Sequence, residues 1–112
     1  MEVKVTEQDG IAVLELVGRM DATTTPEFES AAQALLAAGK KQLLVDMAQL
    51  EYISSAGLRG VLGLVKAIKV SGGKLAFCSL QPMAAEVFRI SGFSAMLTVC
   101  DDRQNAFKAL QA

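Results

Sequence analysis

Apolar and polar residues follow two different periods along this chain, and each change of period marks a predicted element. Residues 3–6 alternate apolar and polar side chains, which predicts a strand with one solvent-exposed face. Residues 8–10 (Gln-Asp-Gly) indicate a turn, and the more apolar segment 11–17 predicts a second strand paired with the first as a hairpin. Three further strands are predicted from short apolar runs at residues 43–45, 75–80 and 96–100.

Between the strands, apolar residues recur every three or four positions, which is the period of an α-helix. Thr24 and Glu27 have the spacing of a capping box around Pro26, so a helix is predicted to begin there and to end at Gly39. Shorter helices are expected after Pro82 and after residues 101–102. The longest pattern follows the four small residues 54–57, and its inward stripe is predicted to be Leu58, Val61, Leu62 and Val65.

The order of these elements predicts the fold class. After the opening hairpin, strands and helices alternate, which favours right-handed crossovers and a largely parallel sheet. We therefore expect one α/β domain over residues 1–112, with a small mixed sheet and helices packed mainly on one face.

Two serines stand where a polar connection turns into the longest helix. A serine in that place can accept a hydrogen bond from the first turn, so one interpretation is that Ser54 and Ser55 only cap the helix. However, Gly60 and Gly63 are predicted to lie opposite the inward stripe, although each glycine costs a helix about 1 kcal/mol relative to alanine. Two glycines on an exposed face make sense if another surface must approach closely, and this predicts a docking face bordered by Arg59.

Two segments of the chain resemble a known family. Residues 45–58, Val-Asp-Met-Ala-Gln-Leu-Glu-Tyr-Ile-Ser-Ser-Ala-Gly-Leu, resemble the signature of the STAS domain family (sulphate transporter and anti-sigma factor antagonist). Residues 18–27, Gly-Arg-Met-Asp-Ala-Thr-Thr-Thr-Pro-Glu, are similar to the family's Gly-x-Leu-Asp-x-x-Thr-x-Pro-Glu element. The resemblance covers essentially the whole chain and implies a STAS-type fold.

The resemblance also implies a function, because the single-domain bacterial members of the family are anti-anti-sigma factors. In them a serine is phosphorylated by a partner that is both anti-sigma factor and serine kinase, and the matching residue here is Ser55. Ser54 stands where the family often has aspartate, and it is a competing hydroxyl. In the family the loop that matches Asp21 lies beside this serine; the other interpretation of Asp21 is a turn carboxylate. The predicted partner-binding residues are Asp21, Thr23, Ser54, Ser55, Ala56, Gly57, Arg59, Gly60 and Gly63.

Composition narrows the remaining classes. A net charge of −1 and the scarcity of aromatic residues argue against nucleic-acid binding. No apolar run reaches the roughly 20 residues needed to cross a bilayer, and no signal peptide is evident, so we expect a cytoplasmic protein that does not insert into membranes. Cys78 and Cys100 are predicted to be reduced packing residues.

The chain also lacks the residues of common catalytic sites. It has no histidine, which excludes Ser-His-Asp and Cys-His arrangements, and Ser71-Gly72-Gly73-Lys74 lacks the remainder of a P-loop. Asp46 has no evident partner in sequence for acid–base catalysis. We therefore expect a binding protein that is not an enzyme, uses no cofactor or metal, and is a monomer when free. The alternative function is a STAS interaction subunit that is not phosphorylated, for example in a lipid-transport or stress-signalling complex.

Overall fold

The first two strands form the expected hairpin. In the computed structural model, which describes residues 1–112, β1 (Glu2–Gln8) pairs antiparallel with β2 (Ile11–Met20). Asp9 and Gly10 connect them with φ of 53° and 79°. Positive φ at both central residues matches the twist of the flanking strands, and Asp-Gly is a favoured pair for such a turn.

The other three strands add to β2 in parallel. β3 (Gln42–Ile53), β4 (Lys74–Cys78) and β5 (Val99–Cys100) follow, giving the order β1-β2-β3-β4-β5. The prediction that the third strand ends at residue 45 is wrong. Beyond it the chain keeps pairing with β2 through two register shifts, which carry the strand to Ile53. The polar residues Gln49 and Glu51 of this extension are exposed.

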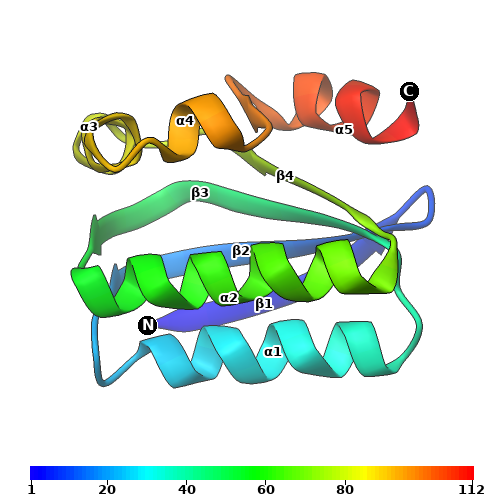
Figure 1. The fold of residues 1–112 in the computed structure, drawn as a ribbon, viewed down its shortest axis with the longest axis horizontal. Coiled ribbons are helices and arrows are strands. Elements are labelled where there is room, and N and C mark those ends of the chain that lie inside the picture. The colour runs from blue at the N-terminus through cyan, green and yellow to red at the C-terminus, as the bar shows by residue number, and fades with distance from the viewer.

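Five helices connect and cover the sheet (Figure 1). They are α1 (Thr25–Ala37), α2 (Ser55–Ser71), α3 (Pro82–Ile90), α4 (Phe93–Met96) and α5 (Arg103–Gln111). The short α4 was not predicted, and it replaces the start of the strand expected at 96–100. None of the helices combines the length and apolarity that crossing a membrane would require.

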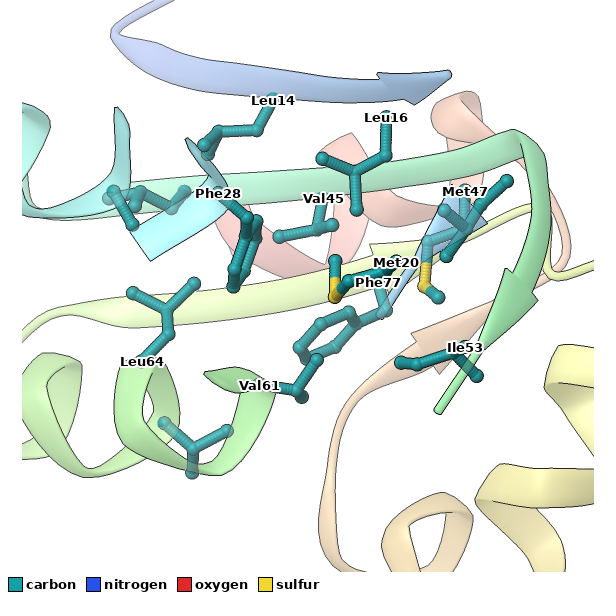
Figure 2. Close-up of a cluster of buried hydrophobic side chains, with 14 of the residues drawn as sticks. Leu14, Leu16, Met20, Phe28, Val45, Met47, Ile53, Val61, Leu64 and Phe77 are labelled. Atoms are coloured by element: carbon teal, nitrogen blue, oxygen red, sulfur yellow. The ribbon is translucent and has the colours of Figure 1, made fainter. Parts of the chain in front are cut away.

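Most of the core lies on one face of the sheet. There Leu14, Val45 and Phe77 from three strands meet Phe28 of α1 and Val61 of α2 (Figure 2). Phe88 of α3 and Phe93 of α4 continue this cluster through edge-on ring contacts. The opposite face carries a smaller cluster under α5, made of Ile11, Val13, Leu44, Ala76, Cys78, Ala106 and Leu110. The expected fold class, with helices mainly on one face, is confirmed.

A partly buried ion network fastens α5 to the sheet. The Nε of Arg103 donates to Oδ2 of Asp46 at 2.5 Å, and its Nη2 donates to Oε2 of Glu15 at 2.7 Å. The other oxygen of Asp46 accepts from the Ala48 N–H at 2.9 Å. Asp46 is 5% exposed, so its carboxylate depends on these donors. The hydrogen bond with Asp46 raises the pKa of the Arg103 guanidinium.

The two cysteines are unbonded neighbours in the sheet. Cys78 is buried and Cys100 is half-buried, and they are register partners on β4 and β5. Burial raises the pKa of the Cys78 thiol to about 11, with the nearby Asp46 carboxylate adding to the shift. Cys78 is therefore an inert packing thiol in this fold.

Candidate functional site

The candidate site lies where β3 ends and α2 begins. The Ser54 N–H donates to the Met20 carbonyl at 2.9 Å, which joins the end of β3 to the end of β2. Ser54 is extended, with φ −93° and ψ 177°, and its Oγ accepts from the Gly57 N–H at 3.2 Å. This is the geometry of an N-cap, so the capping interpretation holds for Ser54.

Ser55 differs from Ser54 in its exposure. It is the first residue of α2 and is exposed, whereas Ser54 is half-buried. The first N–H groups of a helix have no partner within the helix and carry the positive end of its dipole. A negatively charged group attached to the Ser55 hydroxyl would therefore stand in a favourable field.

The loop between β2 and α1 is organised by Asp21. Its Oδ1 accepts from the Thr23 N–H at 3.0 Å, from the Thr23 hydroxyl at 2.7 Å and from the Thr24 N–H at 3.1 Å. The hydrogen bond from the Thr23 hydroxyl is the main cause of a lowered pKa for Asp21. The turn interpretation of Asp21 thus has a clear structural basis, and Thr23 lies exposed at the tip of the loop.

The capping box predicted for α1 is not formed. Thr24 occupies the N-cap position without a side-chain cap bond, and its hydroxyl donates to the Arg19 carbonyl at 2.7 Å instead. Asp21 instead supplies the hydrogen-bond acceptor at the start of α1. Its carbonyl accepts from the Thr25 N–H at 2.9 Å and from the Thr25 hydroxyl at 2.6 Å. The spacing alone could not show that an upstream residue would take over the cap.

The predicted bare face of α2 needs a correction at Gly60, which is buried against α1. A Cβ at Gly60 would lie 2.6 Å from Cγ2 of Thr25, and one at Gly57 would lie 2.8 Å from Cγ1 of Ile53. Of the three glycines within α2, only Gly63 faces open space. The buried residues of α2 are Gly57, Gly60, Val61, Leu64, Val65 and Ile68. The inward face of the helix is therefore rotated about the helix axis relative to the predicted one. The close approach served by Gly60 is that of α1 within the same chain.

The surface left at this end of α2 is therefore smaller than predicted. Ser55, Arg59 and Gly63 are exposed, Ala56 is half-buried, and Gly57 and Gly60 contribute no accessible surface of note. Arg59 lies four residues after Ser55, so both point to the same side of the helix.

Alanine at Gly60 and at Gly63 should have opposite effects on stability. At Gly60 the new methyl group must displace Thr25, whose hydroxyl is already bonded to Asp21. Overpacking costs about 1–3 kcal/mol and outweighs the gain of about 1 kcal/mol in helix propensity. At Gly63 only the propensity gain remains. In urea unfolding we expect Gly60→Ala to lose about 1 kcal/mol and Gly63→Ala to gain about 0.5–1 kcal/mol. A stabilised Gly60→Ala variant would contradict the observed packing of α1 on α2.

Sequence reasoning missed one pair at the border of the site. The Arg19 guanidinium stacks on the Tyr52 ring, with its carbon 4.3 Å from the ring centroid. The two residues are register partners on β2 and β3, but only after the shifts in pairing between these strands. No local pattern in the sequence signals this contact.

Comparison with known proteins assigns the chain to a family. The STAS domain matches residues 2–106. The chain belongs to the STAS domain family. A relative in Bordetella bronchiseptica, BtrV, which is named as an anti-sigma factor antagonist, is 33% identical over 99% of this chain and 96% of its own length.

Solved structures share the STAS fold. A Thermotoga maritima protein assigned as an anti-sigma factor antagonist superposes with a TM-score of 0.93 at 17% identity, covering 98% of this chain and 95% of its own. The Bacillus cell-fate determinant SpoIIAA, solved in a phosphorylated form, superposes with a TM-score of 0.75 at 16% identity, covering 96% and 98%. At these identities the likeness concerns the fold.

Proposed function

We propose that this STAS protein is an anti-sigma factor antagonist: it binds an anti-sigma factor that is also a serine kinase, and phosphorylation of Ser55 switches that binding off. The observation that carries the proposal is the exposed Ser55 at the N-terminus of α2, joined through Ser54 and Met20 to the loop that holds Asp21 and Thr23. The names of relatives along the whole chain support the same role. Such a protein works in the cytoplasm.

Ser55 is favoured over Ser54 as the modified residue. The Ser54 hydroxyl is half-buried and accepts the Gly57 N–H, so a kinase would have to break the cap to reach it. Serine and aspartate are both good N-caps, so the departure from the family pattern at Ser54 preserves the helix start. The phosphorylated form of SpoIIAA, which has the same fold, is consistent with a phosphate carried on this scaffold.

The proposed switch is electrostatic as well as steric. A phosphate adds a charge of about −1.5 to −2 and three acceptor oxygens at neutral pH. The helix N-terminus stabilises this charge, so the domain itself tolerates the modification. A partner that packs over Ser55 does not, because the charge would enter a desolvated contact. Binding of the unmodified protein occupies the anti-sigma factor and frees the sigma factor.

The test is phosphorylation by a purified anti-sigma factor kinase from the same organism, with ATP, followed by mapping of the phosphate by mass spectrometry. We expect one phosphate on Ser55 in the wild type and in Ser54→Ala, and none in Ser55→Ala. A phosphate on Ser54 would overturn the assignment. A chain that stays unmodified while forming a stable complex would instead support the alternative of an unphosphorylated interaction subunit.

A further inference from the structure

Two of the four arginines border the proposed site, and neither has a carboxylate partner. Arg89 pairs with Glu86, and Arg103 pairs with Asp46 and Glu15. Arg19 and Arg59 take part in no ion pair, although both are exposed. The carboxylate of Glu51, next to Tyr52 in sequence, bonds to neither of them. Arg19 is a register partner of Tyr52 where β2 and β3 end, and Arg59 lies in the first turns of α2.

Arg19 is also held in place. Its guanidinium lies over the face of Tyr52 at 4.3 Å, a ring that is itself half-buried on β3. A stack of this kind uses the face of the guanidinium and leaves its edge N–H donors free. Because the group is already oriented, it loses less freedom when it binds a planar anion than a free side chain would. Edge donors in this geometry suit a carboxylate.

The pair lies beside the turn that presents Ser55. Met20, the next residue after Arg19, accepts the Ser54 N–H through its carbonyl, and its side chain is buried in the core on the α2 side. Because side chains alternate along a strand, Arg19 points to the opposite face of the sheet. A protein that covers Ser55 and reaches over the strand ends would meet the Arg19 guanidinium.

We propose that the Arg19–Tyr52 pair receives a carboxylate of the protein that docks at Ser55. This inference rests on the proposed function and names the chemistry of the partner: its docking face carries an aspartate or glutamate.

The main test is calorimetric titration of the anti-sigma factor kinase used above with five variants. Arg19→Ala should weaken binding about 10-fold, and Arg19→Lys should not restore it, because an ammonium lacks the planar fork. Tyr52→Leu should weaken binding about threefold through loss of the platform, whereas Tyr52→Phe keeps the ring and should bind like the wild type. Arg89→Ala, a matched exposed arginine on α3, should change nothing. Wild-type affinity in Arg19→Ala would overturn the proposal.

A second measurement separates this inference from the proposed function. If the kinase fails to bind the wild-type chain, the proposed function is wrong. The Arg19–Tyr52 pair is then tested as a carboxylate receptor by NMR titration with hexaglutamate whose termini are capped. A saturating shift of the Arg19 Nε–H that is lost in Tyr52→Leu, with no comparable shift at Arg89, supports a carboxylate receptor. Equal shifts at Arg19 and Arg89 would overturn it, since they would show only general attraction of an acidic peptide.

Discussion

A Ser55→Asp variant should bind the proposed partner, an anti-sigma factor kinase, about 30-fold more weakly than the wild type. The aspartate puts a full negative charge at the exposed first residue of α2, where the proposed partner packs. Bringing an unpaired charge into a desolvated contact costs roughly 2 kcal/mol or more, and each 1.4 kcal/mol is a factor of ten in affinity. The measurement is isothermal titration calorimetry with purified proteins.

Two further substitutions separate charge from size at Ser55. Asparagine has nearly the shape of aspartate without its charge, so Ser55→Asn should lose much less affinity than Ser55→Asp. Ser55→Ala should keep wild-type affinity and resist the kinase. Equal affinities for all three variants would show that the partner does not cover Ser55. If Ser55→Asn binds as weakly as Ser55→Asp, bulk rather than charge controls the contact.

Replacing Arg103 with methionine should lower the free energy of unfolding by about 2–3 kcal/mol. The substitution leaves the Asp46 carboxylate buried with only the Ala48 N–H to satisfy it. Orphaning one partner of a buried ion pair costs about 3–5 kcal/mol. The lower figure is expected here because the Arg103 side chain is 38% exposed and water can reach part of the site. The measurement is equilibrium unfolding in urea.

The control is a pair on the surface. Arg89 and Glu86 lie one helical turn apart with largely exposed side chains, so Arg89→Met should change stability by less than about 0.5 kcal/mol. A double variant, Asp46→Leu with Arg103→Met, should recover much of the loss, because an apolar pair leaves no orphaned charge. A single Arg103→Met variant as stable as the wild type would show that Asp46 does not depend on Arg103.

The local elements followed from the sequence because their signals are local. Gln8-Asp9-Gly10 indicated the hairpin turn, and the helical period from Leu58 to Ile68 marked α2 without any tertiary information. The resemblance around Ser54 and Ser55 placed the candidate site at the start of this helix. Which serine is the cap required coordinates, since both residues suit the position and only the structure shows the Ser54 hydroxyl on the Gly57 N–H.

The sequence by itself determined the family, the five strands and every helix except the short α4, because these depend on patterns within a few residues. The tertiary structure decided which face of α2 is free, since Gly60 packs on Thr25 from a different helix. It also decided the partners of two charged residues: Arg103 reaches Glu15 across 88 positions, and Arg19 meets Tyr52 only after two register shifts. Contacts between distant segments depend on how whole elements pack, and no short stretch of sequence carries that information.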